Sequence, residues 1–357
     1  MVETPVRPNA VIDCDIHNVV PSLDALKPYL TPHWQEFFPQ SGFRGPAAAS
    51  TFTSGGPILA EADVHPPAGN SPGSDLTLLQ EQILDPLNVE YGILNCGYAV
   101  ESLRNPYSAQ ALSSAVNDWQ ITEWLEPEPR LRASLVVPSQ DPDLAAKEIR
   151  RLGGHPGFVQ IFMPVRSPEL YGQRRFFPIY EAAVEQGLAI GIHFGGEPGT
   201  ATTASGWPGH YVEEYAGMAQ LFQVQLVSLV VEGVFEQFPE LRVALIASGI
   251  TWLPGLIWRL DKEWKGLRRE VPWIKRLPSE YIRDHVKMTL TPLDIPPEPH
   301  LLTQIFDQIA CDEMVMFSTD YPYRHFKTVD EAMPAGIPIL LEEKILTENA
   351  RAFYQLD

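Results

Sequence analysis

Eight short apolar runs, rich in Val, Ile and Leu, recur along the chain. They cover residues 10–16, 90–96, 131–138, 157–164, 188–194, 241–247, 286–292 and 314–320. Because each run is continuous and does not alternate with polar residues, it predicts a strand that is buried on both faces, which is typical of parallel sheets. We therefore expect eight buried strands.

Helical stretches separate most of these strands. Residues 141–154 begin with Asp141, a good N-cap residue, and residues 176–187 end with Gly187, a residue type that often terminates helices. Alternation of strand and helix repeated eight times predicts an α/β fold, a distorted (β/α)8 TIM barrel. An open, doubly wound sheet is the alternative, but no GxGxxG motif follows the first strand.

Two long segments interrupt the alternation. A chain of 357 residues fits one barrel with insertions, so we expect a single domain over residues 1–357. One insertion covers about residues 18–88 after strand 1 and is dense in Gly, Pro and Ser; the other covers 195–217 after strand 5. Both follow the carboxyl end of a strand, so we expect both to lie over the face where barrel enzymes carry their active sites.

Composition and charge exclude several classes of function. The formal net charge is −19, which opposes binding to nucleic acids and to anionic membrane surfaces. No stretch approaches the ~18 uninterrupted apolar residues of a membrane span, and the first residues lack an export signal, so we expect a cytoplasmic protein. The three cysteines are far apart and odd in number, which predicts reduced thiols and no disulfide.

Potential metal ligands stand where three of the predicted strands end. Asp15 and His17 close strand 1, His193 closes strand 5 and Asp320 closes strand 8. Spacing of two residues in a strand puts Asp15 and His17 on the same side, so that both can face the barrel mouth. Asp13 shares this parity and is either a partner of the ligands or part of the opposite end of the barrel. Imidazole and carboxylate donors suit Zn²⁺, Mn²⁺ or Fe²⁺.

Four stretches form a specific combination of motifs. They are DIH at 15–17, FFPIYEAAVEQGLAIGIHFG at 176–195, VFEQFPELRVALIASGITWLPGLIWRLD at 234–261 and FSTDYP at 317–322. Together they resemble the amidohydrolase-related family (amidohydrolase 2), in particular the branch named after aminocarboxymuconate semialdehyde decarboxylase. That branch contains decarboxylases of γ-resorcylate and other aromatic acids, hydratases and hydrolases, so the resemblance does not decide the reaction.

The resemblance implies one divalent metal ion in a barrel. Its ligands would be Asp15, His17, His193 and Asp320. Many relatives have HxH where this chain has DIH, and the variants with an acid at the first position tend toward Mn²⁺ or Zn²⁺. We therefore expect Zn²⁺ or Mn²⁺, with Fe²⁺ as a further option.

The chain departs from the family after strand 6. Relatives carry a His or a Glu where this chain has Ala247, and that residue is the proposed general base or substrate contact. With Ala at this position three alternatives remain. Asp320 alone transfers the proton, a group from a loop does so, or the metal chemistry is altered or lost. His325 can replace the missing imidazole, and Arg324 can bind a substrate carboxylate.

Two further residues are candidates for substrate binding. Arg166 follows strand 4 on the expected active-site face, and His210 lies in the insertion after strand 5. We also expect a homo-oligomer, a dimer or larger, as the resemblance suggests.

The favoured function is a metal-dependent hydrolase that acts on a small cyclic or aromatic carboxylate-bearing molecule. The alternative is a metal-dependent, non-oxidative decarboxylase of an aromatic or unsaturated acid, a carboxy-lyase. A second alternative is a catalytically silent barrel that serves in binding, and Ala247 motivates it.

Overall fold

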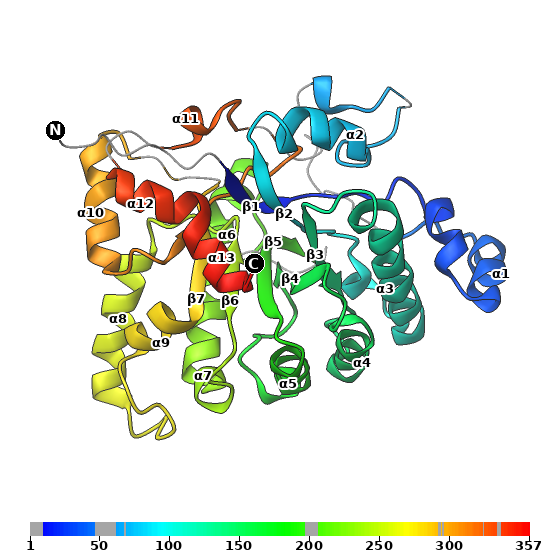
Figure 1. Ribbon diagram of the computed structural model, residues 1–357. Coiled ribbons are helices and arrows are strands. Elements are labelled where there is room, and N and C mark those ends of the chain that lie inside the picture. The colour runs from blue at the N-terminus through cyan, green and yellow to red at the C-terminus, as the bar shows by residue number, and fades with distance from the viewer. Residues whose placement is uncertain are drawn as a thin grey trace.

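The computed structural model describes residues 10–46, 62–67, 69–196, 206–291, 294, 296–323, 325–333 and 337–357. Eight strands form one parallel sheet in the order of the chain. They are β1 (Val11–Ile16), β2 (Val89–Leu94), β3 (Leu131–Val136), β4 (Phe158–Arg166), β5 (Ala189–Gly196), β6 (Val243–Ile246), β7 (Val286–Thr289) and β8 (Val315–Met316). This arrangement is the predicted (β/α)8 barrel (Figure 1).

Helices surround the sheet on its outer side (Figure 1). The described α-helices are α1 (Pro32–Ser41), α2 (Leu76–Leu79), α3 (Pro106–Gln120), α4 (Pro142–Leu152), α5 (Phe177–Glu185), α6 (Tyr211–Val231), α7 (Val234–Gln237), α8 (Leu253–Leu267), α9 (Pro278–His285), α10 (Pro299–Ile309), α11 (Val329–Ala332), α12 (Ile339–Glu343) and α13 (Asn349–Tyr354). Shorter 3₁₀ or π turns are η1 (Leu23–Tyr29), η2 (Ala62–Val64), η3 (Gln80–Leu84), η4 (Val100–Ser102), η5 (Ile121–Leu125), η6 (Arg174–Phe176) and η7 (Lys344–Glu348). None of the described helices is both long and apolar enough to cross a membrane.

The predicted N-cap of α4 is confirmed. The side chain of Asp141 accepts a hydrogen bond from the backbone N–H of Leu144, which satisfies one of the free donors of the first turn.

The eighth strand is much shorter than the predicted run of 314–320. Beyond Met316 the chain leaves β7 and turns toward β1: Cys14 N donates to Phe317 O (3.0 Å), Asp320 N donates to Asp15 O (3.0 Å) and His17 N donates to Tyr321 O (2.7 Å). Asp320 also has a positive φ of 60°, which a regular strand does not tolerate. These bonds place residues 317–321, which follow β8, beside β1 and nearly close the barrel.

The core has two parts. The larger cluster packs the helices on the outside of the sheet. The smaller one joins residues of β1, β2, β5, β6 and β8 to Phe353 and Tyr354 of α13. The C-terminal helix therefore covers the end of the barrel at which several strands begin, and the carboxyl ends of the strands stay open for a site.

The predicted insertions are partly helical. The described part of 18–88 contains η1, α1, η2, α2 and η3, and α1 stands out at the side of the barrel (Figure 1). The C-terminal part of the second predicted insertion, 195–217, is helical, because α6 begins at Tyr211. Glu213 explains this start, since its carboxylate accepts hydrogen bonds from the backbone N–H groups of Gly209 and His210 (3.0 and 2.7 Å).

Candidate metal centre

Asp15 and His17 stand at the carboxyl end of β1. The Asp15 side chain is fully buried. Its Oδ1 accepts a hydrogen bond from Nδ2 of Asn95 at 3.0 Å and lies 3.8 Å from Nε2 of His17. Strand 1 is buried along its whole length, and of the two side chains at its end Asp15 is shielded from solvent while His17 is 16% exposed.

His193 reaches the same point from β5. Its Nε2 lies 3.1 Å from Asp15 Oδ1, and its Nδ1 lies 2.7 Å from the carbonyl oxygen of Phe194. A carbonyl only accepts hydrogen bonds, so Nδ1 donates to it, and Nε2 is the ring nitrogen left to bind a metal ion. This is the arrangement in which histidine binds a metal ion.

Asp320 lies beside His17. Its Oδ1 is 3.1 Å from His17 Nε2, and its Oδ2 is 2.8 Å from Nε2 of His325. Burial acts to raise the pKa of Asp320, but the hydrogen bonds from His17 and His325 outweigh it and hold the pKa below its usual value. The carboxylate is therefore ionised and placed between two imidazoles.

The donor set fits a divalent cation. Ligand atoms of Asp15, His17 and His193 all lie within 4.8 Å of one another. Oδ2 of Asp15 is buried and has no hydrogen-bond partner among the described residues, which leaves one lone-pair site free for a cation. Burial acts to lower the pKa of His17, yet the carboxylates of Asp15 and Asp320 raise it to about 9, so the site favours positive charge. Asp320 stands at the edge of this cluster, and its role as a fourth ligand stays a prediction.

Asp13 lies outside the ligand cluster but is a partner of it, since its Oδ1 accepts a hydrogen bond from the backbone N–H of Asp15 at 3.2 Å. The alternation expected for β1 is interrupted. The pairing of β1 with β2 shifts its register between Asp13 and Ile16. Asp13 is fully buried and accepts hydrogen bonds from the backbone N–H (2.9 Å) and the hydroxyl (2.6 Å) of Thr319. Burial raises its pKa to about 7. Asp13 thus ties β1 to the segment that carries Asp320.

A cavity of about 180 Å³ opens above these residues. Its base is formed by His17, His193, Asp320 and Ala247, and its walls by Phe194, Tyr211, Tyr215 and Tyr323. The aromatic walls were not predicted from the sequence. The spacing of Tyr211 and Tyr215, one turn apart at the start of α6, was the one available signal.

Ala247 lines the cavity at the position where the resemblance led us to expect a His or a Glu. It has a positive φ of 57°, and its backbone N–H donates to the hydroxyl of Thr289 at 2.8 Å. The backbone therefore aims a methyl group at the cavity, so this position supplies neither a base nor an acid.

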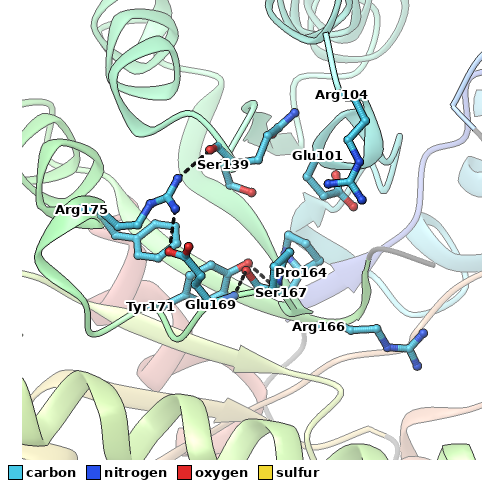
Figure 2. A pocket seen from close by; sticks show the side chains of 12 residues that line it. Glu101, Arg104, Ser139, Pro164, Arg166, Ser167, Glu169, Tyr171 and Arg175 are labelled. Atoms are coloured by element: carbon cyan, nitrogen blue, oxygen red, sulfur yellow. Dashed lines mark hydrogen bonds and ion pairs between the residues drawn. The ribbon is translucent and has the colours of Figure 1, made fainter. Parts of the chain in front are cut away.

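Arg166 stands at the end of β4 and lines a second cavity. That second cavity, of about 210 Å³, is also lined by Glu169 and Arg175 (Figure 2). The guanidinium of Arg166 points away from the Arg175–Glu169 ion pair (Figure 2) and binds Glu214 of α6 instead, with Nη2 2.7 Å from Oε1. Its role in substrate binding stays a prediction.

His210 is placed outside the metal cavity. Its side chain is 84% exposed, and its Nδ1 lies 3.2 Å from Glu213 at the start of α6. The predicted contact of His210 with substrate has no support from this position, because the ring lies in solvent at a helix cap. Arg324, the other predicted carboxylate ligand, lies outside the described residues.

Comparisons with known proteins agree with the fold and identify the family. Residues 12–356 match the model of the amidohydrolase family. The γ-resorcylate decarboxylase of Rhodococcus jostii is 26% identical over 302 residues, which cover 79% of this chain and 88% of the relative.

Solved structures share the architecture at lower identity. The dihydroxybenzoic acid decarboxylase of Polaromonas sp. JS666, solved with bound manganese and the inhibitor 2-nitroresorcinol, has a TM-score of 0.69 at 20% identity, with 98% of both chains covered. The 5-carboxyvanillate decarboxylase of Sphingomonas paucimobilis has a TM-score of 0.72 at 20% identity, with 98% of this chain and 100% of the other covered. The family match spans nearly the whole chain and includes every strand of the barrel, and the chain accordingly belongs to the amidohydrolase family.

Proposed function

We propose that this protein is a metal-dependent decarboxylase of small aromatic carboxylic acids. One observation carries the proposal: a cluster of carboxylates and imidazoles forms the base of a cavity whose walls are aromatic side chains. A flat ring fits between such walls, and its carboxylate can then face the metal cluster.

The relatives support decarboxylation over hydrolysis. The sequence narrowly favoured a hydrolase, because the chain departs from the family after β6. The R. jostii relative and both solved structures described above are decarboxylases by name, and the relative matches most of this chain. That agreement outweighs a preference that rested on Ala247 alone.

Asp15, His17 and His193 would hold the metal ion, with Asp320 beside them. A bound divalent ion would act as a Lewis acid toward the substrate carboxylate and a neighbouring oxygen. The carboxylate ligand favours a harder ion, and the Polaromonas structure contains manganese, so Mn²⁺ is the ion to test first.

The side chains of this protein account for the remaining steps. Phe194, Tyr215 and Tyr323 hold the ring in the cavity and exclude water from it. The bond between the ring and the carboxylate breaks, its electron pair stays on the ring carbon, and carbon dioxide leaves. The Asp320 carboxylate takes a proton from His325, 2.8 Å away, and passes it to the ring carbon, and His325, whose side chain is partly exposed, regains a proton from solvent.

The roles of the other predicted residues remain part of the proposal. Arg166 can bind a substrate anion only if its ion pair with Glu214 breaks, so we assign Arg166 to the rim of the site. Arg324 and His210 keep their predicted roles in substrate binding, although the exposed ring of His210 offers no support for that role. Organisation as one domain over residues 1–357, assembly into dimers or larger oligomers, and cytoplasmic location likewise stay predictions.

A turnover assay distinguishes the candidate functions. The protein loaded with Mn²⁺ is incubated with 2,6-dihydroxybenzoate and with 5-carboxyvanillate, and carbon dioxide and the ring product are quantified. Release of carbon dioxide by the wild-type protein, lost in Asp320→Asn, would support decarboxylation. Aryl esters and lactones serve as parallel probes. Their hydrolysis without release of carbon dioxide from either acid would favour the hydrolase, and metal binding without any turnover would favour a binding protein.

A further inference from the structure

A continuous series of buried hydrogen bonds joins Asp15 to the C-terminal helix. Asn95 Nδ2 donates to Asp15 Oδ1 at 3.0 Å. Gln160 Nε2 donates to Asn95 Oδ1 at 3.1 Å, and the hydroxyl of Tyr354 donates to Gln160 Oε1 at 2.9 Å. Asn95 and Gln160 are fully buried, and Tyr354 is 4% exposed. The series therefore runs through the barrel from α13 to the metal cluster.

The direction of each hydrogen bond follows from the one before it. Burial raises the pKa of Tyr354 far above its usual value, so its hydroxyl stays protonated and donates. Because Gln160 accepts this bond through its carbonyl oxygen, its amide N–H₂ faces Asn95. Asn95 accepts from Gln160 and also from Ser134 Oγ at 2.7 Å, which turns its own N–H₂ toward Asp15. All three donors thus point toward the metal ligand.

This polar series replaces the apolar side chains that usually fill a barrel. Polar side chains in a closed interior require complete hydrogen bonding, which restricts each amide to one orientation. The result at the metal cluster is specific: Asn95 occupies Oδ1 of Asp15, and Oδ2 stays without a partner among the described residues.

Gly191 provides the space for Gln160. A Cβ atom at this position of β5 would lie 2.4 Å from both Cδ and Nε2 of the Gln160 amide. The Gln160 amide is held from both sides by hydrogen bonds, so it has no free direction in which to move. Gly191 lies two residues before His193, so the same strand supplies a metal-cluster residue and the space for the series.

We propose that Asn95, Gln160 and Tyr354 are positioning residues that orient the carboxylate of Asp15, so that the C-terminal helix α13 contributes to the metal affinity of the site. The proposal depends on the metal site named in the proposed function and does not depend on the reaction. Removal of a residue that hydrogen-bonds a metal ligand commonly weakens metal affinity about 10- to 100-fold, and we expect a loss of this size when Asn95 is removed.

The test is a titration of the metal-free, full-length protein with Mn²⁺ by calorimetry. Asn95→Leu is expected to weaken the affinity about 10- to 100-fold, and Tyr354→Phe to weaken it by a smaller factor, because two hydrogen bonds separate the lost hydroxyl from Asn95. The matched control is Tyr180→Phe, which also removes a buried tyrosine hydroxyl, one that donates to the backbone oxygen of Tyr171. Its affinity for Mn²⁺ should stay unchanged.

A further variant keeps the proposal testable if Asn95→Leu does not fold. Gly191→Ala removes no polar group but displaces the Gln160 amide, and it should weaken Mn²⁺ binding in a protein whose melting is still cooperative. Equal affinities of Tyr354→Phe and Tyr180→Phe, or wild-type affinity of Asn95→Leu, would overturn the proposal. If the wild-type protein bound Mn²⁺ without decarboxylating any acid, the proposed function would fail and these affinities would still decide the role of the series. A wild-type protein that bound no divalent ion would overturn both.

Discussion

Oδ2 of Asp320 lies 2.8 Å from Nε2 of His325, five residues further along the chain. The other oxygen of the same carboxylate contacts His17 in the metal cluster. Asp320 thus connects the candidate metal site to a partly exposed imidazole. This connection offers a route for a proton in place of an ionisable side chain at Ala247.

His325→Gln tests this route. We expect kcat for decarboxylation to fall at least 10-fold, in line with the ~10²–10⁴-fold contribution of a general acid or base, while KM and metal content stay near wild-type values. Steady-state kinetics and metal analysis measure these quantities. The matched control is His300→Gln, whose imidazole is exposed and lies 3.2 Å from Glu298 at the start of α10, and we expect wild-type kinetics. Equal losses in both variants would contradict the assignment.

His193→Ala should abolish metal binding. The imidazole contributes one of three donors within 4.8 Å, and a site left with two protein ligands loses most of its affinity. Elemental analysis of the purified proteins should find one Mn, Zn or Fe per wild-type chain and none in the variant. His33→Ala, which changes an exposed histidine of α1, should keep the full metal content. Retained metal in His193→Ala would place the ion elsewhere.

Ala247→His should weaken substrate binding by filling the cavity. The position lines a space of about 180 Å³ next to the metal cluster, and histidine tolerates a positive φ better than most larger residues. We expect KM to rise for aromatic acids, with an unchanged melting temperature within a few degrees. Ala247→Gly is the control, because it keeps the cavity open and suits the backbone. An increase of kcat in Ala247→His would instead show that the imidazole of the relatives restores a lost catalytic step.

Glu128→Gln should destabilise the protein in a way that depends on pH. Both oxygens of Glu128 bind Arg130, Oε1 to Nε at 2.9 Å and Oε2 to Nη2 at 2.7 Å, and these bonds lower the pKa of the carboxyl to about 2. Because the pKa of Glu128 is lower in the folded state, its ionised carboxylate stabilises the folded protein fully at pH values above its unfolded pKa of about 4.5. This stabilisation is lost as the pH falls toward 2.

We therefore expect a loss of about 1–3 kcal/mol at pH 7, reduced by the partial exposure of Arg130, and a smaller loss at pH 3. Denaturant unfolding at the two pH values measures this difference. The neighbouring Glu126→Gln, at an exposed position, should have little effect at either pH. A loss that did not depend on pH would show that the carboxylate charge is irrelevant.

The sequence alone determined the barrel and the identity of the metal-cluster residues. Buried parallel strands require continuous apolar runs, and these runs can be seen without knowledge of the fold. Each candidate ligand stands directly at the end of such a run, so the topology of a barrel brings Asp15, His17 and His193 to one face whatever the details of packing.

Only the tertiary structure decided which neighbours complete the site. The short β8 follows from backbone bonds to β1, and the separate position of Asp13 follows from a register shift between β1 and β2. The aromatic walls come from α6, from Phe194 of β5 and from Tyr323 of a loop. The series from Tyr354 to Asp15 joins four segments far apart in the chain. Periodicity reports contacts between residues a few positions apart, whereas these features arise from hydrogen bonds and packing between distant segments, which no local pattern encodes.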